Sequence, residues 1–242
     1  MLYLISIGLS KNNISIGAIE SIKVCTKIYL ENYTNLYPNS IEEIESIFKK
    51  KIIVLQREGV ENNSSMLIEE AKKTNIALLV YGDVLTATTH ISLLLEAKKK
   101  NVETKVIHGS SILTAVAECG LSLYNFGKVS SLPFGNENVI SVIENIKLNR
   151  KSNLHSLILL DLDPVNEIFV SINDALFYLE KNGFKEKEKI IVCCQLGFNS
   201  DIQCGDIKKL KKIKFDKFPQ CIIIPAKKLH FVEEEYLNNL KV

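Results

Sequence analysis

The chain has 242 residues, 46% of them hydrophobic, and a mean hydropathy of +0.10, which excludes a disordered protein because so many apolar residues can fill a core. Thirty basic and 28 acidic residues leave a net charge of +2, and only two of the bases are arginines. A nucleic-acid-binding protein ordinarily carries more arginine, and no apolar run reaches the roughly 18 to 20 residues of a membrane span, so we expect neither nucleic acid nor a membrane as a partner.

Short apolar runs alternate with longer amphipathic stretches along the first half of the chain. The predicted elements are a strand over 2–7, helices over 14–32 and from a Ser40-x-x-Glu43 capping box toward residue 50, a strand over 52–55, a helix over 64–74, a strand over 76–81, a helix from Thr88 or Thr89 to residue 100, a strand over 103–108 and a helix over 112–119. This alternation predicts a mostly parallel sheet that helices cover on both faces.

The second half continues the alternation with more polar connections. We predict strands over 129–134, 157–162, 190–196 and 221–224, helices over 139–147, 172–182 and 233–241, and a polar loop to about Gly205 before a helix that ends near residue 212. Pro133 lies inside the first of these strands, which makes it an edge strand. We place the domain boundary between residues 110 and 125, with one α/β domain over 1–115 and another over 116–242.

Polar and glycine residues that directly follow apolar strands are the candidate site, because ligands of open α/β sheets bind beyond the carboxyl ends of the strands. Five places qualify: Gly8-Leu9-Ser10, Gly82-Asp83, Ser110-Ser111-Ile112, Leu160-Asp161 and Gln195-Leu196-Gly197. None carries a Gly-x-Gly-x-x-Gly or Walker pattern, which disfavours NAD and ATP. Asp83 is the most informative carboxylate: it could accept hydrogen bonds from a ligand amine or ribose hydroxyls, or it could cap the following helix.

The cysteines and histidines give no sign of a metal centre. The six cysteines are scattered without a C-x-x-C pair, and several extend apolar strands, so we expect buried core residues rather than disulfides. The four histidines lack metal-ligand spacing, and we expect no metal. The first residues lack the cationic leader of a signal peptide, and we therefore expect a cytoplasmic protein.

Five segments resemble a known family. Residues 82–90, GDVLTATTH, resemble the GDPxxATTH loop of the diphthine synthases, which are part of the tetrapyrrole-methylase superfamily. Four further segments resemble motifs of the same family. Residues 30–34 resemble its LExYT motif, and residues 108–112 resemble its HxxSI motif. Residues 119–128 resemble its CGLQLYxFG motif, and residues 229–233 resemble its LHxxE motif. The chain departs from the pattern at Ser6 and Ser10, which replace glycines, and at Val84, which replaces a proline.

The resemblance implies an S-adenosylmethionine-dependent methyltransferase with two α/β domains of the tetrapyrrole-methylase type and a cofactor cleft between them. It implies that the substrate is the aminocarboxypropyl-histidine intermediate on translation elongation factor 2 in diphthamide biosynthesis, that the product cofactor is S-adenosylhomocysteine and that the protein is a homodimer. Carried over by motif, the implied cofactor contacts are Leu9, Asp83, Thr86, Ser111, Ile112, Leu160, Gly205 and His230, many of them through backbone groups.

Methyl transfer from a sulfonium mainly requires that the methyl donor and the acceptor be aligned in a site from which water is excluded. We therefore expect catalysis to depend on positioning of the reactants rather than on a dedicated general base. His90 and His230 then orient loops or contact the cofactor. The sequence does not decide the number of methyl groups or whether one forms an ester. The alternatives are a porphyrinoid or ribosomal-RNA methylase of the same superfamily and a non-catalytic module of the same fold.

Overall fold

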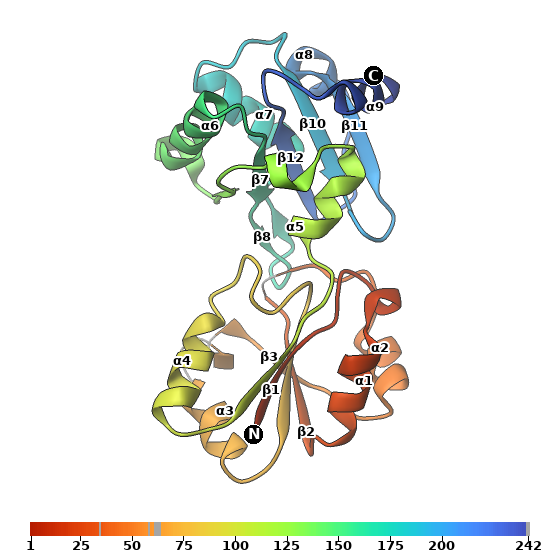
Figure 1. Ribbon diagram of the computed structural model, residues 1–242, viewed down its shortest axis with the longest axis vertical. Helices are drawn as coiled ribbons and strands as arrows, with labels where there is room; N and C mark the ends of the chain where they lie inside the picture. Colours follow the sequence, from red (N-terminus) through yellow and green to blue (C-terminus); the bar gives the residue numbers. More distant parts are fainter. Residues whose placement is uncertain (34, 58, 61–63, 241–242) are drawn as a thin grey trace. The chain divides into compact units, whose positions relative to one another are not determined.

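The computed structural model describes residues 1–33, 35–57, 59–60 and 64–240 of the chain. The chain divides into two compact units (Figure 1). The first comprises Met1–Ile112 and the short segment Asp163–Asn166, and the second comprises Leu113–Leu162 and Glu167–Val242. In the part of the chain that the structure describes, no helix is long and apolar enough to cross a membrane.

The first unit is built on a five-stranded sheet in the order β3-β2-β4-β1-β5, in which every pairing is parallel. Its strands are β1 (Leu2–Ser6), β2 (Lys27–Glu31), β3 (Ile53–Leu55), β4 (Ile76–Val80) and β5 (Thr104–Ile107), and its helices are α1 (Ile16–Lys23), α2 (Ile41–Phe48), α3 (Ser64–Ala71) and α4 (Ile91–Lys99). The helices α1 and α2 lie on one face of the sheet and α3 and α4 on the other (Figure 1).

The alternating side chains of β1 explain why both faces are covered. Leu2 and Leu4 pack in one hydrophobic cluster with α3 and α4, whereas Tyr3 and Ile5 pack in another with α1 and α2. Successive side chains of a strand point to opposite faces, so a strand that is apolar at every position needs a helix layer on each side. The sequence prediction of a parallel, doubly covered sheet is confirmed for this unit.

The second unit contains a mixed five-stranded sheet in the order β11-β10-β12-β7-β6. Its strands are β6 (Ser130–Leu132), β7 (Ser156–Leu160), β10 (Lys189–Cys194), β11 (Asp201–Asp206) and β12 (Gln220–Ile224), and the hairpin of β8 (Leu162–Asp163) and β9 (Ile168–Phe169) follows β7. Its helices are α6 (Ser141–Lys151), α7 (Ile172–Lys181), α8 (Ile207–Leu210) and α9 (Phe231–Asn239), and the short α5 (Ile112–Ala115) begins at the last residue of the first unit's main segment. Only β6 and β7 pair in parallel, and the other pairings are antiparallel.

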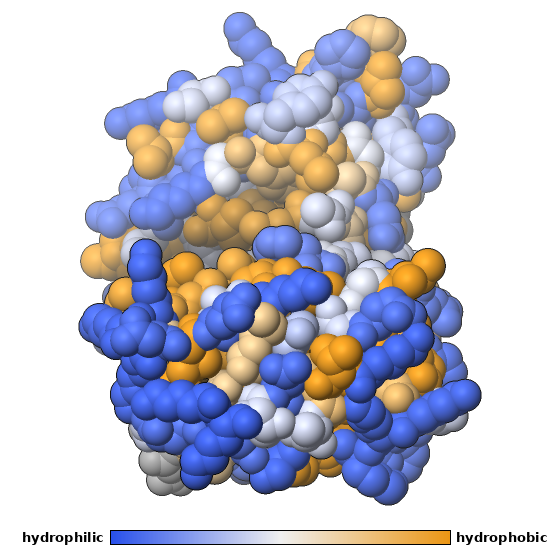
Figure 2. Space-filling view, turned by 60° about the horizontal axis from the view of Figure 1, so that its bottom comes forward, coloured by the Kyte–Doolittle hydropathy of each residue, from blue (hydrophilic) through white to orange (hydrophobic). Residues whose placement is uncertain are grey.

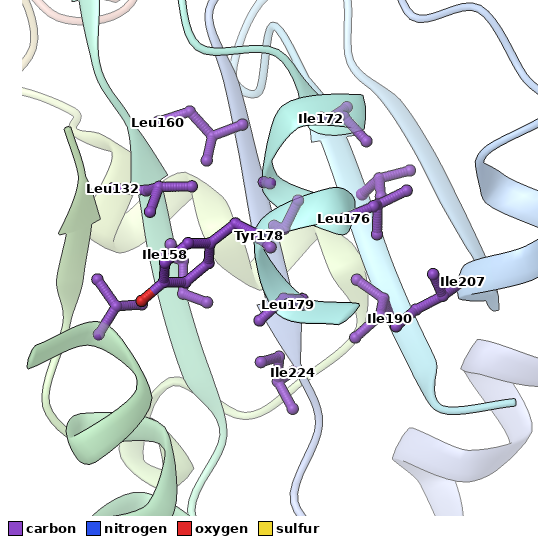
Figure 3. Close-up of a cluster of buried hydrophobic side chains, with 14 of the residues drawn as sticks. Leu132, Ile158, Leu160, Ile172, Leu176, Tyr178, Leu179, Ile190, Ile207 and Ile224 are labelled. Atoms are coloured by element: carbon purple, nitrogen blue, oxygen red, sulfur yellow. The ribbon is translucent and has the colours of Figure 1, made fainter. Parts of the chain in front are cut away.

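One face of this second sheet packs against α6, α7 and α8. Figure 3 shows Ile172, Leu176 and Leu179 of α7 directed at the side chains of the strands, and all three are fully buried. The capping box of Ser171 and Asp174 fixes the start of α7, because each side chain accepts a hydrogen bond from the other residue's backbone N–H. The short strand β6 lies at the sheet edge, as Pro133 predicted.

Two segments differ from the predictions. The helix predicted over 14–32 is wrong in its second half, because α1 ends at Lys23 and Lys27–Glu31 forms β2. The consecutive apolar residues of this strand are buried on both faces of the sheet, and its pairing with β3 and β4 overrides the helical spacing. The polar loop predicted to Gly205 is also wrong, because Asp201–Asp206 pairs with β10 as the edge strand β11.

Most of the remaining helix predictions and the cysteine prediction hold. The helix predicted over 112–119 is α-helical only over Ile112–Ala115 and continues as a 3-10 helix over Val116–Cys119. Ser40 and Glu43 form the predicted capping box at the start of α2. Neither Thr88 nor Thr89 caps α4, because the N-cap residue is His90. All six cysteines are buried and none forms a disulfide, as expected for core residues. Burial raises the pKa of the Cys119 thiol to about 12. The predicted end of the last helix at residue 241 lies outside the described residues.

The surface of the first unit that faces the viewer in Figure 2 is mostly hydrophilic, with separate apolar groups between the charged side chains. Exposed lysines also lie at helix ends of this unit, as Lys98 and Lys99 in the last turn of α4 illustrate. A cation near the carboxyl end of a helix is favourable because the macrodipole leaves negative partial charge there. These lysines thus have a structural reason for their positions that requires no anionic ligand.

Candidate functional site

Three glycines bring the ends of β1, β4 and β5 into contact. The Gly8 N–H donates to the Gly82 carbonyl oxygen at 3.2 Å, and the Gly82 N–H donates to the Gly8 carbonyl oxygen at 2.8 Å. A Cβ on Gly109 would lie 2.8 Å from the Cβ of Ser6, which real Cβ atoms do not tolerate. Because β1 lies between β4 and β5 in the sheet, the turns after these strands converge at one carboxyl edge.

The turn after β1 is tied to the turn after β5. Gly8 has a φ of +71°, and a Cβ there would lie 2.5 Å from the Cβ of Asn13, so the turn requires glycine. The N–H of the next residue, Leu9, donates to Ser110 Oγ at 3.3 Å. Ser111 follows directly and is buried at 5% exposure. The structure therefore brings Leu9 and Ser111, two predicted site residues, to the same edge of the sheet.

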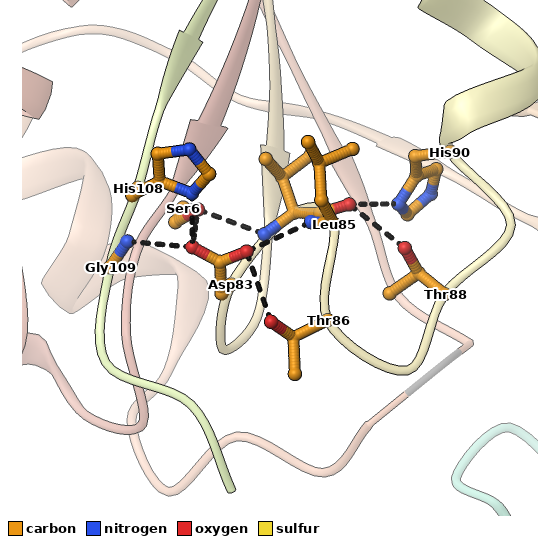
Figure 4. Close-up of polar contacts among 9 residues, drawn as sticks. Ser6, Asp83, Leu85, Thr86, Thr88, His90, His108 and Gly109 are labelled. Carbon is orange, nitrogen blue, oxygen red and sulfur yellow. Dashed lines mark hydrogen bonds and ion pairs between the residues drawn. The ribbon is translucent and has the colours of Figure 1, made fainter. Parts of the chain in front are cut away.

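The carboxylate of Asp83 lies at the centre of these turns (Figure 4). Its Oδ1 accepts hydrogen bonds from the Leu85 N–H at 3.0 Å and from Thr86 Oγ1 at 3.2 Å. Its Oδ2 accepts from the Gly109 N–H at 3.1 Å and contacts His108 Nδ1 at 2.8 Å. The side chain thus joins the loop after β4 to the end of β5, and it brings Thr86 into the same cluster.

These contacts bear on the two roles predicted for Asp83, a ligand contact and a helix cap. Burial alone raises the pKa of this carboxyl group, but the N–H groups of Leu85 and Gly109 together with His108 outweigh it, and the pKa lies below its ordinary value. The carboxylate is therefore ionised at neutral pH, and protein donors fill its roughly four acceptor positions. It does not cap α4, whose N-cap is His90. The carboxylate of Asp83 therefore holds the loop after β4 against the end of β5.

A second buried pair holds the far end of the same loop. His90 Nε2 lies 2.7 Å from Glu31 Oε2 with both side chains at 2% exposure or less. The other ring nitrogen, Nδ1, lies 3.1 Å from the Val84 carbonyl oxygen, which also accepts from Thr88 Oγ1 at 2.8 Å (Figure 4). Glu31 ends β2, so this pair anchors the loop to the sheet.

The structural role of His90 agrees with the expectation that it orients a loop. The sequence did not indicate its partner, because 58 residues separate Glu31 from His90 and both lie in different motifs. Position 34, which belongs to the same motif as Glu31, lies outside the described residues.

Ser6 and Val84, two of the residues that depart from the family pattern, contact each other. Ser6 Oγ accepts a hydrogen bond from the Val84 N–H at 2.9 Å and lies 3.5 Å from Asp83 Oδ2. A proline at position 84 has no N–H to donate, and a glycine at position 6 has no acceptor. Ser6 and Val84 therefore form a matched pair in this chain. Ser10 has a φ of −157°, which any residue adopts, so it needs no glycine.

The edge leaves room for a ligand beside its backbone. Gly82 is buried and has a φ of +73°, yet a Cβ built on it would meet no heavy atom within 4 Å. Its neighbours along the loop include the exposed Leu85 and Ala87 and the half-buried Thr86. Open space beside a glycine at a strand end, next to N–H groups and small apolar side chains, is a cradle for a ligand that is recognised through backbone contacts.

The three predicted site residues of the second unit are not brought together. Leu160 ends β7, and the sheet register aligns this end with Gln220 and Cys194. Gly205 lies in β11 opposite Ile190, at the other end of the sheet. Leu160 and Gly205 are three strands apart across the sheet and about four residues apart along the strand direction. Together these spacings correspond to a separation of roughly 20 Å. His230 precedes α9, after the end of β12 that pairs with the start of β7.

His230 and Glu233 explain why two of the matched motifs meet. His230 is the N-cap of α9, and its N–H donates to Glu233 Oε2 at 3.0 Å in a capping box. Glu233 Oε1 accepts from the Ser122 N–H at 2.9 Å and lies 3.4 Å from His155 Nε2. The carboxylate thus joins the last motif to the segment around Ser122. Burial raises its pKa, but these hydrogen bonds outweigh it and lower the pKa to about 2.

Comparisons with known proteins give the family. Residues 1–201 match the tetrapyrrole (corrin/porphyrin) methylases. The chain is 40% identical to a diphthine synthase of Methanocaldococcus jannaschii over 99% of this chain and 98% of the relative, and 45% identical to a diphthine methyl ester synthase of Saccharomyces cerevisiae over 98% and 88%. A crystal structure of diphthine synthase superposes with a TM-score of 0.92 at 34% identity, covering all of this chain and 96% of the other. The chain therefore belongs to the tetrapyrrole methylase family and, within it, to the methyltransferases known as diphthine synthases.

Proposed function

We propose that this protein transfers methyl groups from S-adenosylmethionine to the aminocarboxypropyl-histidine of translation elongation factor 2 in diphthamide biosynthesis. The observation that supports this proposal most strongly is the convergence of three motif-bearing turns at the carboxyl edge of the first sheet. These turns contain Leu9, Asp83 and Ser111, and they carry motifs or positions matched to diphthine synthases. The relatives with these names match along nearly the whole chain.

The residues at this edge fit the cofactor. The open space at Gly82 accepts part of a ligand, and Leu9, Thr86, Ser111 and Ile112 follow β1, β4 and β5 with backbone groups and apolar or small side chains. S-adenosylmethionine supplies a methyl group on a sulfonium, an electrophile that needs no metal ion for transfer. It lacks phosphates, which agrees with the absence of a glycine-rich phosphate loop in the sequence.

The protein's own task in this reaction is to align the two reactants and to exclude water from them. A carboxylate acceptor is already a nucleophile, whereas an amine acceptor must first lose a proton. Among the described residues at this edge, the titratable side chains are engaged: Asp83 with its donors, His108 with Asp83, and Glu31 with His90. This pairing favours alignment of donor and acceptor over proton abstraction by a dedicated side chain.

Three further parts of the proposal concern the second unit and assembly. Leu160, Gly205 and His230 remain predicted cofactor contacts, and the separation of Leu160 from Gly205 makes Gly205 the weakest of them. A homodimer also remains a prediction, and sedimentation equilibrium of the purified protein measures it. Elongation factor 2 is the only macromolecular substrate in the proposal.

Two of the alternatives differ from the proposal in the methyl acceptor, and the third lacks activity. A porphyrinoid or ribosomal-RNA methylase shares the family, and a non-catalytic module shares the fold. The names of the full-length relatives favour the protein substrate over the first two. The intact cradle at Gly82 favours a ligand-binding protein over the third.

Incubation with methyl-labelled S-adenosylmethionine and elongation factor 2 that carries the unmethylated intermediate tests the proposal. We expect label on elongation factor 2 and none on factor that lacks the intermediate. Mild alkali then distinguishes an ester, which releases label as methanol, from N-methyl groups, which retain it. Label on a porphyrin or on ribosomal RNA in place of the factor would overturn the assignment.

A further inference from the structure

The second unit contains a pocket that the cofactor contacts do not use. It has a volume of about 290 Å³, close to the lower limit of roughly 300 Å³ for small-ligand sites, which suits one amino-acid side chain. Its walls come from the turn after β6 and from β9 and α7. Four aromatic rings line it: Phe134, Phe169, Phe177 and Tyr178.

Three charged groups surround these rings. Asp174 and Lys181 lie on the same face of α7 as Phe177, at spacings of three and four residues, and Glu137 lies on the turn after β6. Among the residues that the structure describes, none of the three charges has an ion-pair partner. Asp174 uses only Oδ2 in the capping box with Ser171, so its Oδ1 has no partner within the same described part of the chain.

The aromatic side chains are placed for a ligand rather than for the core alone. Phe177 is 63% exposed and Phe134 is 39% exposed, although large apolar side chains normally bury most of their surface. Tyr178, in contrast, is buried and supports the floor of the pocket, and Figure 3 shows its ring among the side chains of the second core. Exposed rings next to unpaired carboxylates favour a cationic, planar ligand.

The pocket adjoins the end of β7, where the predicted cofactor contact Leu160 lies. The N–H of Val170, a pocket residue, donates to the Asp161 carbonyl oxygen at 2.9 Å, and Asp161 directly follows Leu160. The Asp161 N–H in turn donates to the Leu132 carbonyl oxygen at 3.1 Å, two residues before Phe134. Two walls of the pocket are thus hydrogen-bonded to the strand end that carries Leu160.

We propose that this pocket binds the acceptor side chain, an imidazole ring with an ammonium and a carboxylate on its substituent. The phenyl rings of Phe134 and Phe177 contact the imidazole, Asp174 and Glu137 attract the ammonium, and Lys181 pairs with the carboxylate. Plain histidine lacks both charges of the substituent, so the pocket distinguishes the modified residue from unmodified histidines. This inference rests on the proposed function for the identity of the ligand.

Kinetics with the modified elongation factor test the pocket. We expect Phe177→Ala and Lys181→Glu each to raise the KM for the factor about tenfold, with kcat changed less than threefold and the calorimetric Kd for S-adenosylmethionine unchanged. Leu148→Ala and Lys147→Glu are matched controls, because these residues are exposed on α6 and do not line the pocket. Equal KM values for the pocket variants and the controls would overturn the proposal.

A titration of the unmodified protein keeps the test independent of variant folding and of turnover. A synthetic peptide that carries aminocarboxypropyl-histidine is added, and the ring protons of Phe134, Phe169 and Phe177 are followed by NMR. We expect these protons to shift, and a peptide with plain histidine to leave them in place. Binding that shifts other residues alone, or no shift at all, contradicts the pocket. If the wild-type protein transfers no label to elongation factor 2, the proposed function fails, whatever the titration gives.

Discussion

The two units use five-stranded sheets of opposite character. In the first sheet every strand runs in the same direction, so the turns after β1, β4 and β5 meet at one edge and place Leu9, Asp83 and Ser111 together. In the second sheet the central strands β10, β12 and β7 alternate in direction. The carboxyl ends of its strands therefore lie at both ends of the sheet, and Leu160 at the end of β7 and Gly205 near the end of β11 lie far apart.

This difference shows in which kind of sheet residues at the ends of strands predict a ligand site. Ligand residues gather after the strands only where neighbouring strands are parallel, because only then do their carboxyl ends share an edge. In the second unit the motif residues His230 and Glu233 instead join a helix start to a loop. The comparison favours ligand binding at the motif turns of the first unit, and it gives His230 and Glu233 a structural role while His230 stays a predicted cofactor contact.

Gly8→Ala is expected to have the largest effect, on the first unit. The added Cβ would lie 2.5 Å from Asn13 Cβ at a φ of +71°, and backbone strain together with overpacking costs about 4 kcal/mol of unfolding free energy. Gly183→Ala is the control, since its φ is +91° but no atom lies within 4 Å, and it should cost about 1 kcal/mol. Urea denaturation measures both, and equal losses would show that close packing of the turns is unimportant.

Glu233→Gln should produce the next largest loss, in the second unit. Folding lowers the pKa of Glu233 from 4.5 to about 2, which corresponds to about 3 kcal/mol of stability. This contribution is complete above pH 4.5 and disappears as the pH falls toward 2, so the variant should lose stability at pH 7 and show a flatter pH dependence between these values. Thermal unfolding across this range measures it, with exposed Glu235→Gln as the control. A variant with the wild-type pH profile would contradict the role of Glu233.

The pair of Ser6 and Val84 gives a smaller, coupled effect. Ser6→Gly leaves the buried Val84 N–H without its acceptor and should cost about 2 kcal/mol. Adding Val84→Pro removes that N–H and should recover about 1 kcal/mol, because the two sites share one hydrogen bond. A double-mutant cycle by denaturation measures the coupling, and strictly additive losses would separate the two positions.

His108→Ala should have the smallest effect. Its side chain is 69% exposed, so solvent screens its interaction with Asp83 and the loss of stability should stay below about 1 kcal/mol. The pKa of Asp83 should rise when this partner is removed, because His108 contributes to lowering it. A carbon-13 NMR titration of the Asp83 carboxyl group measures the shift. An unchanged pKa would assign the lowering to the backbone N–H groups alone.

The sequence predicted the shared strand edge of the first unit better than the complete fold of the chain. The apolar runs of β1, β4 and β5 are unmistakable, and their positions sufficed to predict that Asp83 lies at a shared edge. The strand β2 was missed because Ile28 continues the helical spacing of Ile19 and Ile22, and β11 was missed because it is polar and contains Gly205. Local propensity is weak at such positions, and pairing with neighbouring strands decides the structure.

The partners of the polar side chains could not be predicted in the same way. The donors to Asp83 include the Gly109 N–H, and the partner of His90 is Glu31, both far away in the sequence. Their proximity follows from the strand order, in which β4 lies between β2 and β1. The sequence therefore allowed Asp83 to bind a ligand or to cap a helix, but it did not indicate the protein donors from which its carboxylate accepts hydrogen bonds.

Calorimetry with S-adenosylmethionine on two aspartate variants tests the central claim most directly. Asp83 and Asp161 each lie just beyond a buried strand, but Asp83 joins the turns of the parallel sheet, whereas Asp161 is exposed and its carboxylate accepts from the neighbouring Leu162 N–H. We predict that Asp83→Asn weakens cofactor binding at least tenfold and that Asp161→Asn changes it less than twofold. Wild-type affinity in Asp83→Asn would contradict the claim that the Asp83-centred edge of the first sheet forms the cofactor site.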